Sequence, residues 1–193
     1  MLWGGVDSNN TNLESKANTN NEIPFCFHIL TDKLSQNMLD KIKALEVALN
    51  EFYPSSFKIY TLCDSVFQGL PKLNDNYLAY FRIKMASVLP KDIKICLYLD
   101  IDMLCVSDIR EIFNIDLDKK ICGVVRDFYY SKNINNVDSK KPGFKINTNS
   151  YFNSGFILID LEKWRNFEVE KKCFDFLANY IPVFHDQDAL NAI

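Results

Sequence analysis

The chain has 193 residues, of which 48% are apolar and 24% are charged, and this composition suits one domain with a sizeable core. A formal net charge of −3 argues against a general nucleic-acid-binding protein. The sequence has no apolar run near the roughly 20 residues of a membrane-spanning helix, and its start lacks the basic-then-apolar order of a secretory signal. Six scattered cysteines without a C-x-x-C pair predict reduced thiols in a cytoplasmic protein, and with only two histidines a zinc site is not expected.

The first third of the chain predicts a polar leader followed by a strand–helix–strand unit. Residues 1–22 are rich in asparagine and show no helical or strand period, so we expect a disordered leader. The apolar run 23–30 predicts a buried strand. A helix is expected to begin after Ser35, a good N-cap, and to end before Pro54. Residues 57–62 predict the second strand.

Strands continue to alternate with helices in the rest of the chain, which predicts an α/β fold with a mostly parallel sheet. In such sheets, ligands bind beyond the carboxyl ends of the strands. The expected elements are helix 76–89, strand 93–99 continued by 103–106 after a bend, short helix 108–113, strand 121–125, polar loop 128–149, strand 151–161 interrupted at 153–155, helix 162–180, and a last helix 187–193 capped by Asp186.

Two acids stand at the end of the most apolar strand. On an extended chain Asp100 and Asp102 would project to the same side, where two buried carboxylates repel unless a cation lies between them. One or two carboxylates plus substrate phosphates commonly hold Mg²⁺ or Mn²⁺, so the pair predicts a metal-diphosphate site. The alternative is an ordinary strand end with two solvated acids. Asp127 and Asn153 are also expected at strand ends, and this convergence favours the functional site.

Four ordered motifs make the chain resemble glycosyltransferase family 8, and within it the bacterial galactosyl- and glucosyltransferases of lipopolysaccharide synthesis. The resemblance covers residues 23–193, which we interpret as a partial GT-A glycosyltransferase domain with a Rossmann-like mixed sheet. It implies a UDP-sugar donor, Mn²⁺ (or Mg²⁺) and transfer with retention to a lipopolysaccharide-type saccharide acceptor. The motifs are Tyr80-Phe-Arg-Ile-Lys84, Leu97-Tyr-Leu-Asp-Ile-Asp102, Tyr151-Phe-Asn-Ser-Gly-Phe-Ile-Leu-Ile-Asp-Leu-Glu-Lys-Trp-Arg165 and Asp186-Gln-Asp-Ala-Leu-Asn191.

The resemblance also implies roles for individual residues. Asp100 and Asp102 match the metal ligands, and Gln187, next to Asp186, matches the position nearest the reacting anomeric carbon. Asp186 and Gln187 are therefore the catalytic candidates. The expected nucleotide-sugar-binding residues are Arg82, Asp100, Ile101, Asp102, Asp127, Asn153, Ser154, Asp186 and Gln187.

The chain departs from the family at both ends. The family's first strand, whose turn holds uridine, is replaced by the asparagine-rich leader, and the family's third metal ligand is a histidine that would lie beyond residue 193. These departures predict a fragment, and peripheral membrane association is expected through the missing C-terminal part. A truncated, non-catalytic remnant with weak nucleotide-sugar binding is therefore an alternative to an active enzyme.

Two further alternatives concern the chemistry. An amide such as Gln187 is a poor nucleophile, which favours front-face departure and attack over a covalent intermediate, with Asp186 or Asp188 as the alternative nucleophile. A D-x-D phosphatase would also place two acids after an apolar strand. That motif needs Thr or Val two residues after the second acid, and Leu104 stands there.

Overall fold

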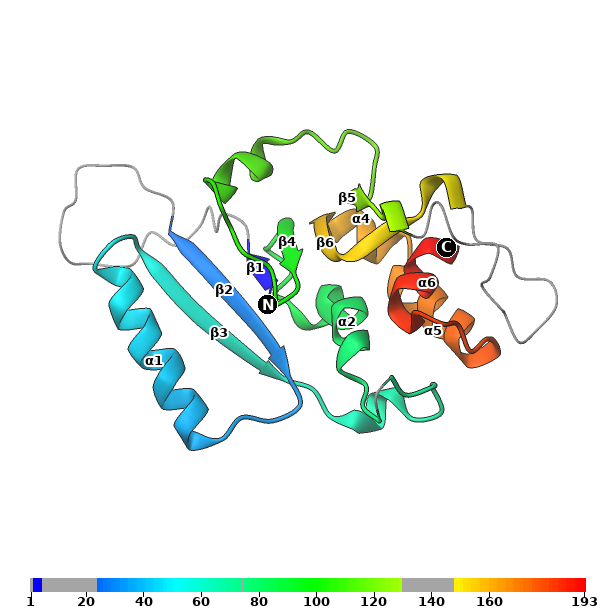
Figure 1. Cartoon of the computed structure of the whole chain (residues 1–193), viewed down its shortest axis with the longest axis horizontal. Coiled ribbons are helices and arrows are strands. Elements are labelled where there is room, and N and C mark those ends of the chain that lie inside the picture. The colour runs from blue at the N-terminus through cyan, green and yellow to red at the C-terminus, as the bar shows by residue number, and fades with distance from the viewer. Residues whose placement is uncertain (1, 5–23, 74, 130–147) are drawn as a thin grey trace.

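A computed structural model describes residues 2–4, 24–73, 75–129 and 148–193 (Figure 1). Within these residues, six strands form one sheet in the order β3-β2-β1-β4-β6-β5. The strands are β1 (Leu2–Gly4), β2 (Phe25–Thr31), β3 (Ser55–Thr61), β4 (Ile95–Leu99), β5 (Cys122–Arg126) and β6 (Phe152–Asp160).

The sheet is mixed, as predicted. Strands β2, β3, β4 and β5 all run in one direction, whereas β1 and β6 run in the other. Because the reversed strands lie between the others, β2 and β3 are the only neighbouring pair in the described sheet that is hydrogen-bonded in parallel. Reversed strands bring their amino ends to the edge where the other four strands end. Residues at the start of β6 can therefore meet residues that follow β4 and β5.

The strand β1 corrects the expectation of an unstructured leader over 1–22. Leu2–Gly4 lies inside the sheet, pairing with β2 on one side and β4 on the other, both antiparallel. Its three residues, Leu-Trp-Gly, were too few to show a strand period in the sequence. Residues 5–23 lie outside the described part of the chain.

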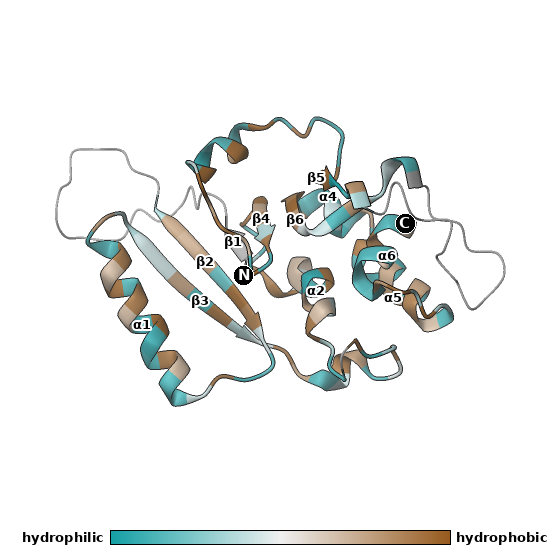
Figure 2. Ribbon diagram, viewed as in Figure 1, coloured by the Kyte–Doolittle hydropathy of each residue, from teal (hydrophilic) through white to brown (hydrophobic). Residues whose placement is uncertain are grey.

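The helices that pack on the sheet come from both the N-terminal and the C-terminal parts of the chain. The described α-helices are α1 (Gln36–Asn50), α2 (Phe81–Val88), α4 (Leu161–Asn166), α5 (Val169–Asn179) and α6 (His185–Ala192). Ser35 caps α1 as predicted, its hydroxyl accepting a hydrogen bond from the Met38 amide at 3.3 Å. Figure 2 shows hydrophobic and hydrophilic residues alternating along α1, a pattern that matches its one-sided packing on β3.

The predicted helix 162–180 is two helices, α4 and α5. They are separated at Glu168, which has a left-handed φ of 58°. Trp164 and Cys173 are nine residues apart, so an unbroken helix would point them about 180° apart. With the break, both are buried, at 3% and 0% exposure. Burial of both side chains therefore accounts for the interruption.

The main core lies where α2, α4, α5 and α6 meet β4 and β6. Its largest fully buried side chains include Tyr80, Phe67, Met85, Ile157 and Leu161. The predicted strand over 103–106 is absent, because Asp100 starts a turn in which the Met103 amide donates to its carbonyl at 3.3 Å. The predicted short helix is a 3-10 helix, Ile109–Asn114.

Two predictions can be compared only with the described part of the chain. Of the polar loop 128–149, residues 130–147 lie outside the described residues. No helix in the described ranges combines the length and the apolar character that crossing a bilayer requires.

Candidate active site

The candidate site begins where β4 ends at the sheet edge. Asp100 follows the last residue of β4, and its backbone amide donates to the Gly155 carbonyl of β6 at 2.9 Å. The Asp100 side chain is partly exposed (35%), and one of its oxygens, Oδ1, accepts a hydrogen bond from the Tyr98 hydroxyl at 2.7 Å. Strand β6 therefore holds the backbone of Asp100, while Tyr98 of β4 holds its carboxylate at the protein surface.

Arg82 joins this carboxylate to the opposite wall of the site. Its guanidinium, projecting from α2, pairs with Asp100 Oδ1 at 3.0 Å and with Asp186 Oδ2 at 3.1 Å. It also donates to the Ser154 carbonyl at 2.7 Å and to the Ser154 hydroxyl at 2.9 Å. The side chain is only 11% exposed, so it is not an ordinary surface arginine. One cation between two carboxylates leaves a local excess of negative charge.

Helix α6 supplies a buried polar wall. Asp186 is 5% exposed and accepts from the Ser154 hydroxyl at 3.1 Å as well as from Arg82. Burial raises the pKa of the Asp186 carboxyl, while Arg82 and Ser154 act against this rise. The predicted N-cap role of Asp186 is wrong: Phe184 precedes the helix, and the Asp186 carboxylate turns toward α2 and β6 because a buried charge needs its partners there.

Gln187 is fully engaged by its neighbours. Its Oε1 accepts from the Ser154 amide at 2.9 Å, and its Nε2 donates to Asp127 Oδ2 at 3.3 Å and to the Tyr151 hydroxyl at 3.2 Å. These contacts fix which end of the amide is oxygen and hold the side chain in one orientation. Asp127, which follows β5, is thereby connected to α6.

The next acid, Asp188, is a structural residue in this arrangement. It is 1% exposed, and its two oxygens accept from the Tyr151 hydroxyl at 2.6 Å and from the Phe184 amide at 2.9 Å. Nearby, Asn191 binds both the amide and the carbonyl of Phe152 at 2.9 Å, which fastens α6 to the start of β6. An occupied, buried carboxylate gives no support to Asp188 as a nucleophile.

Gly155 leaves room for two oxygen atoms. A Cβ at this position would lie 2.6 Å from Asp100 Oδ2 and 2.9 Å from Asn153 Oδ1, closer than real Cβ atoms approach. Asn153 Oδ1 also accepts from the Gly155 amide at 2.8 Å. The predicted break at Asn153 corresponds to a register shift in the pairing of β5 with β6, beside Val125. The irregular strand therefore brings two side-chain oxygens toward one point.

Ile101 and Asp102 are not drawn into this cluster. They are the two central residues of the turn that follows β4, so the chain is not extended there and the period-2 argument does not apply. Ile101 is 86% exposed, and Asp102 is exposed without a hydrogen bond or ion pair to any described residue. In the described ranges, no group of three or more His, Cys, Asp or Glu residues is arranged to hold a metal.

Two adjoining cavities open at this sheet edge. One, of about 530 Å³, is lined by Asp100 and Ile101 together with apolar residues of the 103–109 segment. The other, of about 440 Å³, is lined by Asp127 and Asn153. Met103 and Phe156 line both cavities. A long ligand could therefore contact predicted site residues from β4, β5 and β6 at once.

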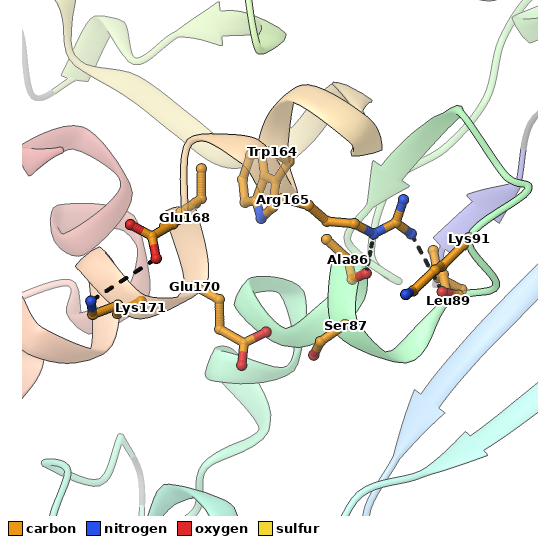
Figure 3. A pocket seen from close by; sticks show the side chains of 10 residues that line it. Ala86, Ser87, Leu89, Lys91, Trp164, Arg165, Glu168, Glu170 and Lys171 are labelled. Carbon is orange, nitrogen blue, oxygen red and sulfur yellow. Dashed lines mark hydrogen bonds and ion pairs between the residues drawn. The ribbon is translucent and has the colours of Figure 1, made fainter.

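A third cavity, of about 450 Å³, lies away from these residues among α2, α4 and α5 (Figure 3). Arg165 points along this cavity and donates to the Ala86 carbonyl at 2.7 Å. Leu89 and Lys91, which follow α2, also line the cavity. None of the predicted site residues lines it. Its arginine satisfies carbonyl groups at the end of α2, a role in the fold.

The structure also assigns site contacts that the sequence did not predict, namely those of Tyr98, Gly155, Tyr151 and Asn191. All four belong to the quoted motifs, so a signal was present in the sequence. Their functions depend on contacts between distant segments, such as the pair of Tyr151 with Gln187 and Asp188, and no single-segment pattern encodes these contacts.

Comparisons with known proteins identify the family of this chain and its fold. The profile of the family described as "Glycosyl transferase family 8" matches residues 9–193. The lipopolysaccharide 1,3-galactosyltransferase of Salmonella typhimurium is 27% identical over 201 residues, which cover 97% of this chain and 57% of that protein. A lipopolysaccharide 1,2-glucosyltransferase of Escherichia coli is 26% identical over 204 residues, covering 99% of this chain and 57% of that protein.

A solved structure, that of the galactosyltransferase LgtC in complex with donor and acceptor sugar analogues, has the same fold. It superposes with a TM-score of 0.69 and 23% identity over 90% of this chain and 60% of that one. The chain spans about half the length or less of most curated relatives it matches, from 30% to 57%. With a family profile that matches nearly its whole length and a GT-A fold, the chain belongs to glycosyltransferase family 8.

Proposed function

We propose that this chain binds the donor in a retaining glycosyltransferase that moves a hexose, galactose or glucose, from a UDP-sugar to a lipopolysaccharide-type saccharide acceptor. The observation that carries the proposal is the convergence of Arg82, Asp100, Ser154, Asp186 and Gln187 at one edge of the sheet in a member of this family. An arginine fork suits phosphate oxygens, and the adjoining cavities suit an elongated nucleotide-sugar.

A divalent cation, Mn²⁺ or Mg²⁺, fits the residues present. The cluster has one cation between two carboxylates, and Asp100 Oδ2 has no hydrogen bond to the described residues. Asp102 lies in the adjacent turn and is exposed, so it can supply a second carboxylate. One or two carboxylates with substrate phosphates is the common way to bind such ions. Bound there, the ion would supply Lewis-acid stabilisation of the leaving diphosphate.

The side chains favour a front-face route. Gln187 is held by Ser154, Asp127 and Tyr151, so it would orient the donor sugar and not attack it. Asp186 is held by Arg82 and Ser154. Neither residue presents a free carboxylate to the anomeric carbon. The leaving phosphate oxygen would then take the proton of the acceptor hydroxyl, and Arg82 would stabilise the developing negative charge, with about 3–4 kcal/mol expected for a well-placed group.

Thermal melting of the 193-residue chain with UDP tests the binding step. A ligand that binds only the folded state stabilises it by about 2.7 kcal/mol at a hundredfold excess over Kd, a rise of roughly 5–10 °C in Tm for a chain of this size. We expect this rise with UDP plus Mn²⁺ and its loss when a chelator removes the metal. Asp100→Asn should abolish it, whereas the control Asp92→Asn, at an exposed position before β4, should keep it.

Melting together with an assay of UDP-sugar turnover separates the enzyme from the non-catalytic remnant. A folded chain whose Tm is unchanged by UDP and Mn²⁺ would support the remnant. A chain that binds UDP and hydrolyses or transfers the sugar of UDP-galactose or UDP-glucose would support the enzyme. Family membership argues against the D-x-D phosphatase, in which Asp100 would have to attack phosphate with a carboxylate that Arg82 and Tyr98 already engage. A cytoplasmic location, at the inner face of the membrane, remains part of this proposal.

A further inference from the structure

Tyr98 contacts both charged groups at the centre of the site. It lies on β4, two residues before Asp100. Its hydroxyl donates to Asp100 Oδ1 at 2.7 Å. The Arg82 guanidinium lies over its ring, 4.6 Å from the centroid. The ring and the hydroxyl thus have different partners.

The two oxygens of Asp100 are in unequal environments. Oδ1 accepts from the Tyr98 hydroxyl and from Arg82 Nη2, while Oδ2 accepts no hydrogen bond from the described residues. Oδ2 instead lies beside Gly155, close to the point that Asn153 Oδ1 also approaches. The oxygen that remains available therefore lies next to a second oxygen ligand.

Without the tyrosine hydroxyl, this inequality would disappear. Arginine and carboxylate readily form a bidentate fork in which both oxygens are used. Arg82 already reaches Oδ1 at 3.0 Å, and rotation of the carboxylate would offer it Oδ2 as well. A second donor on Oδ1 opposes that rotation, because it would break the hydrogen bond from Tyr98. The hydroxyl thereby keeps Oδ2 from becoming a second ligand of the arginine.

We infer that Tyr98 is a positioning residue that acts through Asp100: its hydroxyl holds the carboxylate so that Oδ2 stays available to the cation that accompanies the diphosphate. This inference rests on the proposed function. Groups that orient a metal ligand commonly contribute 10–100-fold to metal affinity. The ring packs against Arg82 whether or not the hydroxyl is present, so Tyr98→Phe removes the positioning contact alone.

The test is a titration with Mn²⁺, followed by the electron paramagnetic resonance signal of the free ion, in the presence of saturating UDP. We expect Tyr98→Phe to bind Mn²⁺ about tenfold or more weakly than the unmodified chain. UDP affinity without metal and Tm without ligand should be close to those of the unmodified chain. The matched control is Tyr60→Phe on β3, which is separated from β4 by β2 and β1 in the sheet. This variant loses the contact of the Tyr60 hydroxyl with His28 at 3.0 Å and should bind Mn²⁺ as the unmodified chain does.

Equal Mn²⁺ affinity in the unmodified chain and Tyr98→Phe would overturn the inference while leaving the proposed function intact. A Tyr98→Phe chain that loses metal-free UDP binding or melts well below the control would also overturn it, because the hydroxyl would then act through the nucleotide or the fold. If the unmodified chain binds no Mn²⁺ with UDP, the proposed function fails first and the role of Tyr98 fails with it.

Discussion

Gly155 gives a sharp test of how tightly the site is packed. In Gly155→Ala, the new Cβ would lie 2.6 Å from Asp100 Oδ2 and 3.1 Å from Asp100 Cγ. Ordinary contacts of this kind begin near 3.4 Å, so the Asp100 carboxylate must move by several tenths of an ångström. It is held by Tyr98 and Arg82, at 2.7 and 3.0 Å, and any movement strains those contacts.

The expected cost follows from two opposing effects. Overpacking of this kind destabilises by about 1–3 kcal/mol, whereas replacing glycine by alanine restricts the unfolded chain and returns about 0.4–1 kcal/mol. The φ of Gly155 is not in the left-handed region, so no backbone strain is added. The midpoints of these two ranges give a net loss of about 1.3 kcal/mol in the free energy of unfolding, or roughly 3–5 °C in Tm.

Urea unfolding measures this loss against a matched control. Gly123→Ala on β5 places its Cβ 3.2 Å from Leu117 Cδ2, the mobile end of a leucine, and should cost less than about 0.5 kcal/mol. In an Asp100→Ala background, the cost of Gly155→Ala should fall by at least half, because the clashing carboxylate is gone. Equal losses at Gly155 and Gly123, or an undiminished loss without the Asp100 carboxylate, would refute the reasoning.

Two further predictions concern buried charge. Arg82→Met should destabilise the chain by about 3 kcal/mol in urea unfolding, because Asp186, which is 5% exposed, would lose its ion pair. Adding Asp186→Asn should restore more than half of this loss. If it restores none, an unpaired buried charge at Asp186 is not the cause. Burial, followed by the charge of Lys58, lowers the pKa of His28 from 6.5 to about 4. The unfolded chain therefore takes up a proton below pH 6.5 that the folded chain refuses, so stability should fall between pH 6.5 and 4, by up to about 3 kcal/mol, and recover as the pH rises. Unfolding midpoints of the unmodified chain and His28→Asn across this range check the sign, and parallel curves would show that His28 is not responsible.

The sequence predicted the elements of the sheet well where the local signal was strong. The N-cap residue Ser35 predicted α1, and the apolar run before Asp100 predicted β4. Both signals are local, because capping and burial act over a few residues. It did not predict β1, a three-residue strand whose stability depends on pairing with β2 and β4. Nor did it predict the break at Glu168, which follows from burying Trp164 and Cys173 against the same core.

The site divides in the same way. The family resemblance grouped Arg82, Asp100, Ser154, Asp186 and Gln187, and the structure brings these residues into contact. The expected geometry of the acid pair was wrong, because the chain turns directly after Asp100 and leaves Asp102 exposed. A period derived from strands does not hold beyond the last residue of the strand. The metal itself remains a prediction.

The many contacts of Arg82 have a consequence for recognition. Before any anion arrives, this long side chain is already immobilised by Asp100, Ser154 and Asp186. Ordering such a side chain during association would cost about 0.5–1.5 kcal/mol in entropy. Here that freedom is lost when the chain folds, so an incoming phosphate meets a guanidinium whose direction is already set.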